Sequence, residues 1–201
     1  MTAVAARPAA PGAARRAREI RSVAMHDPLV RPLLDELSHE YWTRYQRVLT
    51  AEELRAEMEH YPAHEFAAPH GDLVLVLEDG APVAGGAFRR RTEPEVGDPA
   101  RLARASARRP DGTPAVRTAE LKRIWTHSAH RRRGLARVVI AELERRAAER
   151  GYRRVYLTTG PRQPEAAGLY LATGYTPLFD TGTDSEEIGP LAFEKWLEVA
   201  P

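Results

Sequence analysis

The 201-residue chain contains no cysteine and only two lysines, Lys122 and Lys195, although it carries 30 basic residues. The absence of cysteine excludes a disulfide framework, a thiolate metal site and a cysteine nucleophile. No apolar run approaches the roughly 18 residues that a membrane-spanning helix requires. We therefore expect a cytoplasmic protein without a membrane partner, and any nucleophilic chemistry must use another residue.

The chain also lacks a strong excess of either charge, since 30 basic residues face 28 acidic residues. This balance argues against a basic nucleic-acid-binding module, so nucleic acid is not the expected partner. The arginine-rich strings "RRTEP", "ASARRP" and "HRRRG" keep that function open as an alternative. Because nearly all basic residues are arginines throughout the sequence, a local arginine cluster is weaker evidence here than in other proteins.

Length and composition predict a single domain, since hydrophobic residues make up 43% and charged residues 29% of the chain. Residues 1–18 are rich in alanine, arginine and proline and predict a disordered leader. A transit peptide is the alternative, which the prolines and the scarcity of serine disfavour. Within the domain, 19–201, the segment 92–115 is rich in proline, glycine and charge and predicts a flexible insertion rather than a structured lid.

Strand and helix patterns alternate along this domain. The expected strands and hairpins cover residues 19–25, 72–91, 116–127, 153–159, 175–179 and 189–197, and the expected helices cover residues 27–49, 50–61, 134–150 and 164–173. Thr50 and Glu53 form a capping-box pattern, and Asp79-Gly80 is typical of a hairpin turn. This order predicts an α/β or α+β fold with right-handed crossovers.

The stretch "SAHRRRGLARVVI", residues 128–140, follows a strand and begins a helix. A helix start presents unpaired backbone N–H groups, and the helix dipole adds attraction for an anion. Gly134 allows a ligand oxygen close to the backbone, and Ala136 keeps the first turn uncrowded. Because the sequence lacks "GxxxxGK[ST]" and "GxGxxG", this phosphate site matches neither a P-loop nor a Rossmann dinucleotide fold.

The region "ELKRIWTHSAHRRRGLARVVIAELERRAAERGYRRVYLTT", followed by "PEAAGLYLATGY", resembles the GNAT superfamily of acyl-CoA-dependent N-acetyltransferases. The pyrophosphate loop of that family has Arg or Gln, two residues, Gly, one residue and Gly or Ala, which Arg131, Gly134 and Ala136 match. The resemblance implies a mixed, mainly antiparallel central sheet flanked by helices, with a splayed strand pair that holds coenzyme A. It also implies acetyl-CoA as co-substrate, an amine acceptor and no metal.

By the same resemblance, backbone N–H groups from Arg132 to Arg137 would hold the pyrophosphate, and the end of the preceding strand would face the pantetheine arm. The implied cofactor-binding residues are Ile124, Trp125, Thr126, His127, Arg131, Arg132, Arg133, Gly134, Leu135, Ala136 and Arg137. His127 and His130 have no third ligand nearby in the sequence, so loop packing or phosphate contact is favoured over a metal site.

Two residues are candidates for the acid–base chemistry. Tyr170 aligns with the tyrosine that often protonates the leaving thiolate in the family, and helix packing is its alternative role. Glu120 is the candidate base for the acceptor ammonium, if strand alternation places it with Ile124 and Thr126 on one face. Its alternative role is an ion pair with Lys122 or a nearby arginine.

The acceptor site is the least defined part of the sequence. Glu120 and Trp42, on the first helix, are the candidate substrate-binding residues. The expected function is an N-acetyltransferase that moves an acetyl group from acetyl-CoA to a primary amine of a small molecule or peptide by direct attack. The alternatives are a non-catalytic acyl-CoA-binding sensor and the nucleic-acid-binding module, and a homodimer stays open as a further partner.

Overall fold

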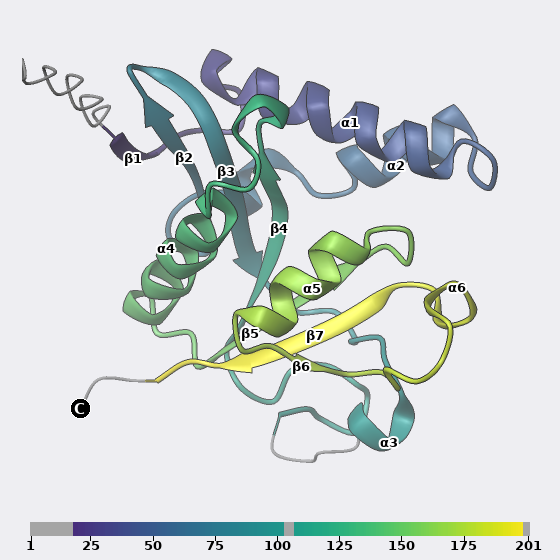
Figure 1. Cartoon of the computed structure of the whole chain (residues 1–201). Helices are drawn as coiled ribbons and strands as arrows, with labels where there is room; N and C mark the ends of the chain where they lie inside the picture. The colour runs from purple at the N-terminus through teal and green to yellow at the C-terminus, as the bar shows by residue number, and fades with distance from the viewer. Residues whose placement is uncertain (1–17, 103–106, 199–201) are drawn as a thin grey trace, which may run out of the picture.

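The computed structural model describes residues 18–102 and 107–198, whose strands join in one seven-stranded sheet (Figure 1). The sheet has the order β1-β2-β3-β4-β5-β7-β6. The strands are β1 (Arg18–Ser22), β2 (Asp72–Glu78), β3 (Ala81–Arg90), β4 (Thr118–Thr126), β5 (Arg154–Thr159), β6 (Thr176–Pro177) and β7 (Leu191–Trp196). Only β4 and β5 pair in parallel among these strands, so the predicted mixed, mainly antiparallel sheet is confirmed. The expected leader lies outside the described residues, except that Arg18 begins β1.

The helices form at the places that the sequence patterns predict, with short additional turns. They are α1 (Arg31–Tyr45), α2 (Ala51–Glu59), α3 (Pro99–Leu102), α4 (Leu135–Glu149), α5 (Pro164–Ala172) and α6 (Ser185–Ile188), with 3-10 turns η1 (Pro28–Val30), η2 (Ala63–Phe66) and η3 (Ser128–His130). Thr50 and Glu53 form the expected capping box at α2. Asp79 and Gly80 both have positive φ, at 52° and 80°, which matches the tight turn predicted between β2 and β3.

The hydrophobic core lies on both faces of the sheet. On one face, α4 buries Val139 and Leu143 against the strands, and on the other face α1 buries Leu33 and Leu37. Figure 1 shows α4 and α5 in front of the sheet, with α5 over β5 and β7. Strand β2 is buried along its whole length between these layers, which accounts for its uninterrupted apolar run.

A β-bulge interrupts β4 and changes which side chains share a face. Gly85 pairs with Trp125, but Ala87 pairs with Lys122, so the register shifts at Arg123, whose φ is +57°. Ile124 consequently packs with the α4 core, whereas Trp125 packs with the α1 core. The regular alternation expected along this strand, which placed Glu120 and Ile124 together, is therefore wrong beyond the bulge.

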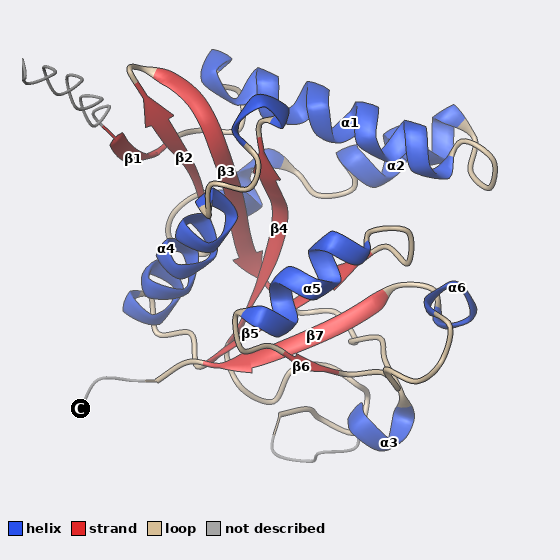
Figure 2. Cartoon of the chain, in the orientation of Figure 1, coloured by secondary structure: helices blue, strands red, loops and turns tan. Residues whose placement is uncertain are grey.

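Strands β4 and β5 separate after a short paired stretch. Their register runs only from Thr118 opposite Arg154 to Glu120 opposite Tyr156, although β4 continues to Thr126. Figure 2 shows β4 rising away from β5 and β7 beyond this point. The splayed strand pair that the family resemblance implies is thus present, and it leaves one edge of β4 without a strand partner.

The segment 92–115 is anchored to the sheet by buried charges in the part of it that the structure describes. Glu95 pairs with the fully buried Arg154 of β5 at 2.7 Å and with Arg108 at 2.7 Å. Glu194 of β7 accepts from the same two arginines. The segment is therefore held at both the Glu95 and the Arg108 positions, and its predicted flexibility stays a prediction.

Candidate functional site

A cavity of about 470 Å³, here the β4–α4 cavity, lies where the splayed end of β4 meets the start of α4 and the inner face of α5. Its lining residues are Leu37, Glu40, Ile124, Trp125, Thr126, Arg131, Arg132, Gly134, Leu135, Ala136, Arg137, Gln163, Glu165, Ala166, Leu169 and Tyr170. The cavity therefore brings together the end of the strand, the arginine–glycine turn and the tyrosine that the sequence pointed to separately.

The first turn of α4 is arranged to bind an anion. The first intrahelical bond runs from Val138 N to Gly134 O at 3.3 Å, so the N–H groups of Leu135 to Arg137 have no acceptor within the helix. Gly134 adopts a left-handed φ of +76°, and a Cβ built on it would meet nothing within 4 Å. The space in front of these N–H groups is therefore free for phosphate oxygens.

The arginines of the turn divide into two groups. Arg133 is paired with Glu78 at 2.8 Å, and Arg131 is paired with Glu40 of α1. Within the described residues, Arg132 and Arg137 form no ion pair with a carboxylate, and both line the cavity. Since an uncompensated guanidinium favours a bound anion, these two side chains are the ones placed to neutralise phosphate charge.

The exposed edge of β4 supplies polar groups to the same cavity. Thr126 Oγ1 is buried and has no hydrogen-bond partner among the described residues. This oxygen is closed off from the open space, so the polar groups that β4 offers there are those of its unpaired backbone edge. The amide and carbonyl groups of a ligand could form hydrogen bonds with this edge.

Glu36 of α1 holds the end of β4 in place. It accepts from Trp125 Nε1 at 2.7 Å and from Ser128 Oγ at 2.8 Å, which ties α1 to the beginning of the arginine–glycine turn. Burial by itself would raise the pKa of Glu36, but the hydrogen bonds from Ser128 and Trp125 outweigh burial and hold this pKa below its ordinary value. Glu36 is therefore a negatively charged anchor at neutral pH.

Tyr170 lies on α5 and lines the cavity with only 6% of its surface exposed. Its ring packs against Tyr175 and Phe193, with centroids 5.7 Å and 5.6 Å away. Burial raises its pKa above the ordinary value for tyrosine, so the hydroxyl stays protonated at neutral pH. The side chain thus packs in the core and still offers a proton at the cavity wall.

Glu120 lies outside the set of cavity residues and is only 1% exposed. It contacts three cations, with Arg89 at 2.8 Å, Arg91 at 3.1 Å and Lys122 at 3.1 Å. These contacts favour its alternative role as an ion-pair partner. Its assignment as a base stays a prediction.

Three other predicted residues also lie outside the set that lines the cavity. Trp42 is 41% exposed on α1, and Arg133 turns to Glu78. His127 accepts from Ala129 N through its Nδ1 and so caps η3. Only some of the predicted site residues therefore line the cavity.

Three polar residues of the cavity wall were missed by the sequence analysis. Glu40 pairs with Arg131, and Glu165 pairs with Arg44 across the gap between α1 and α5. Gln163 lines the cavity beside them. No local pattern marks these residues, because each is brought to the site only by the packing of α1 and α5 against the splayed strands.

Two negative observations apply to the residues that the structure describes. No group of three or more His, Cys, Asp or Glu side chains is placed to hold a metal ion in 18–102 and 107–198. In the same ranges, the helices lack the combination of length and apolarity that crossing a bilayer requires.

Comparison with known proteins places these features in a family. The sequence model of the acetyltransferase (GNAT) family matches residues 34–175, and no curated protein matches the chain. The structure is similar to an acetyltransferase from Streptococcus agalactiae, with a TM-score of 0.58, 16% identity, and coverage of 90% of this chain and 98% of that chain.

Two further solved structures share the fold. The PaiA N-acetyltransferase from Thermoplasma acidophilum, solved in complex with coenzyme A, has a TM-score of 0.59, 13% identity, and coverage of 90% of this chain and 99% of that chain. The GNAT domain of PAT from S. lividans has a TM-score of 0.54, 19% identity, and 89% coverage of both chains. At these identities the similarity establishes the fold.

Proposed function

We propose that this chain, which belongs to the acetyltransferase (GNAT) family, transfers an acetyl group from acetyl-CoA to a primary amine of a small molecule or peptide. The observation that carries the proposal is the β4–α4 cavity, where the free N–H groups of α4 and the unpaired edge of β4 line one space. An anion site and an amide-binding strand edge are the two features that a pantetheine diphosphate needs together.

The diphosphate of acetyl-CoA would lie over the first turn of α4. Backbone N–H groups from Leu135 to Arg137 would donate to its oxygens, and the Arg132 and Arg137 guanidinium groups would neutralise its charge. The pantetheine arm would follow Ile124, Trp125 and Thr126 toward Tyr170. A backbone N–H at the β4 edge would then stabilise the negative charge that develops on the thioester oxygen.

Direct transfer is the chemistry that these groups support. The amine nitrogen attacks the thioester carbonyl carbon, the C–N bond forms, and the C–S bond breaks with its electron pair leaving on sulfur. Tyr170 donates its proton to that thiolate, and Glu120 or a water chain removes the proton from the attacking amine. Because the chain contains no cysteine, a thioester intermediate on the protein is excluded.

A screen of amines with acetyl-CoA tests the proposal. Thiol release is measured for amino acids, polyamines, aminoglycosides and peptides, and mass spectrometry identifies the acetylated product. We expect release to depend on one amine class and to match product formed. Tight binding of coenzyme A without any acetylated amine would instead support the sensor alternative.

The roles of Glu120 and Trp42 are tested separately. If Glu120 were the base, Glu120→Gln would lower kcat/KM most strongly at low pH while leaving acetyl-CoA affinity unchanged. If it is an ion-pair partner, the variant loses stability and keeps its pH profile.

Trp42→Ala would raise KM for the amine only if Trp42 contacts the acceptor. A cytoplasmic location and a homodimer stay predictions.

A further inference from the structure

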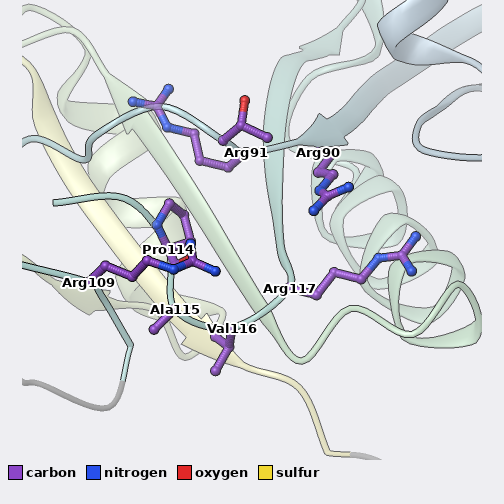
Figure 3. Close-up of a pocket in the computed structure, with 8 residues that line it drawn as sticks. Arg90, Arg91, Arg109, Pro114, Ala115, Val116 and Arg117 are labelled. Atoms are coloured by element: carbon purple, nitrogen blue, oxygen red, sulfur yellow. The ribbon is translucent and has the colours of Figure 1, made fainter. Parts of the chain in front are cut away.

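A second cavity, here the arginine cavity, lies at the other end of β4, where β3 ends and β4 begins. Its volume is about 220 Å³. The lining residues are Arg90, Arg91, Thr92, Arg109, Pro114, Ala115, Val116 and Arg117. Figure 3 shows Arg90 and Arg117 on one side and Arg109 on the other, beyond Pro114 and Ala115. Half of the lining residues are therefore arginines drawn from three separate segments.

Three of these arginines lack an ion pair in the part of the chain that the structure describes. Within the described residues, Arg90, Arg109 and Arg117 form no ion pair with a carboxylate, whereas most other arginines of the sheet and helices do. Arg91 differs, because Glu120 accepts from it at 3.1 Å. The cavity consequently keeps three arginines that form no ion pair, although the charge of Arg109 helps to lower the pKa of nearby Asp111.

Local contacts position two of these three arginines. Arg90 is the last residue of β3, and Arg117 lies over the Tyr152 ring with its guanidinium carbon 4.7 Å from the ring centroid. Arg109 donates to Pro114 O at 2.6 Å across a tight turn. The preceding Arg108 is buried against Glu95, so the turn is anchored. Arg109 and Arg117 are thus held by neighbouring groups, whereas the Arg90 side chain is exposed at the end of its strand.

Like charges around one hollow repel one another, and a concave wall strengthens the field that they create. A bound anion would relieve this repulsion. Guanidinium groups are well suited to phosphate, because their planar N–H forks match its oxygen atoms. A volume of about 220 Å³ has room for a phosphoryl group with a few carbon atoms.

We propose that the arginine cavity is a second anion site that binds a small phosphoryl-bearing ligand, either free phosphate or a phosphomonoester. This site is distinct from the β4–α4 cavity, since the two share no lining residue. It also uses arginines from two arginine-rich strings that the acetyl-transfer site does not use, namely Arg90 and Arg91 from "RRTEP" and Arg109 from "ASARRP". The proposal does not depend on acetyl transfer.

Calorimetric titration of the full chain with inorganic phosphate, and separately with glycerol 3-phosphate, tests the proposal. Arg90→Gln/Arg117→Gln should weaken binding by about a hundredfold, since each lost charge-assisted contact is expected to cost about tenfold. The matched control is Arg47→Gln/Arg55→Gln, which removes two exposed arginines that line neither cavity. Comparable affinity for the two probes indicates a phosphomonoester site, and binding of phosphate alone indicates the free ion.

A third double variant separates the two cavities. Arg132→Gln/Arg137→Gln should leave this phosphate site intact, whether or not coenzyme A binds elsewhere. The proposal is overturned if only that variant loses phosphate, or if the surface control weakens binding as much as Arg90→Gln/Arg117→Gln. Salt-sensitive binding of a single-stranded oligonucleotide that phosphate does not displace would also overturn it, in favour of nucleic acid.

Discussion

The β4–α4 cavity and the arginine cavity lie at opposite ends of one strand, and both are lined by arginines without carboxylate partners in the described chain. Arg132 and Arg137 line the first, and Arg90, Arg109 and Arg117 line the second. The first cavity also has apolar side chains, free helix N–H groups and a buried tyrosine. In the second, four of the eight lining residues are arginines, and the others are Thr92, Pro114, Ala115 and Val116. Arginines around a hollow can attract an anion, but acetyl transfer requires the additional groups of the β4–α4 cavity.

The two cavities also differ in how the sequence encodes them. The loop from Arg131 to Ala136 is contiguous, so its residue pattern alone is enough to indicate a phosphate site. The arginine cavity joins the end of β3 to residues near 109 and 117, which only the antiparallel pairing of β3 with β4 brings together. Within an arginine-rich chain, sequence alone could not distinguish these arginines from solvated surface.

The largest expected effect is a loss of turnover on replacing Tyr170, which separates the acetyl-transfer step from acetyl-CoA binding. Tyr170→Phe keeps the ring and removes the proton donor, so turnover should fall by roughly ten- to a thousandfold, with acetyl-CoA affinity little changed. Tyr175→Phe is the matched control, because its buried hydroxyl donates to Glu144 at 2.9 Å. That variant should lose on the order of 1 kcal/mol of stability and keep its turnover.

Steady-state kinetics and thermal melts on both tyrosine variants check this contrast. If Tyr170→Phe retains wild-type turnover with an acceptor for which chemistry limits the rate, water or another group protonates the thiolate. Tyr170 would then be a packing residue of α5.

The next effect compares the arginines of the two cavities directly. Arg132→Gln/Arg137→Gln should weaken coenzyme A binding by about a hundredfold, since two charge-assisted contacts to phosphate are lost. Arg90→Gln/Arg117→Gln should leave coenzyme A affinity within about twofold of wild type, because those side chains line the other cavity. Equal losses in both variants, measured by calorimetry, would mean that net charge rather than position controls the affinity.

A smaller effect concerns the glycine at the start of α4. Gly134 and Gly151 have nearly the same left-handed φ, +76° and +78°, and a Cβ added to either would have no neighbour within 4 Å. Alanine at either site should therefore cost about 1–2 kcal/mol of stability. Only Gly134→Ala should also weaken coenzyme A binding, by about tenfold, since its methyl group enters the phosphate space. Equal affinities, measured by calorimetry, would place the phosphate elsewhere.

The smallest expected effect is the pH dependence of the Glu36 anchor. Because hydrogen bonds hold its folded pKa below the ordinary value, its contribution to stability is complete above that ordinary pKa and is lost as pH falls through the folded pKa. Glu142, whose pKa is lowered to about 2 by Arg145 and Arg146, also contributes stability that is lost as pH falls. Denaturant unfolding of wild type and Glu36→Gln isolates Glu36, since their stability difference should shrink toward low pH. A constant difference would contradict the assignment.

Local patterns predicted much of this fold because they act within a few residues. The capping box at Thr50, the Asp79-Gly80 turn and the apolar stripe of α4 are each determined by neighbours in the sequence. The bulge at Arg123 escaped prediction, since it depends on the register of β4 against β3. That single shift is enough to separate Glu120 from Ile124.

In the candidate site, too, the sequence indicated the parts that belong to short local motifs. The arginine–glycine turn and Tyr170 belong to contiguous motifs, and the structure brings them to one cavity. Glu36, by contrast, contacts Trp125 and Ser128, which lie 89 and 92 residues further along the sequence. Such partners come from tertiary packing, so no local signal marks them.

Calorimetric titration of the full chain with acetyl-CoA, joined to a thermal melt, tests the central claim most directly. A ligand that binds only the folded state raises the melting temperature by mass action. The account predicts saturable binding at one site and a higher Tm that Arg90→Gln/Arg117→Gln retains and Arg132→Gln/Arg137→Gln loses. Absence of heat and of any Tm shift at millimolar acetyl-CoA would contradict the assignment of the β4–α4 cavity.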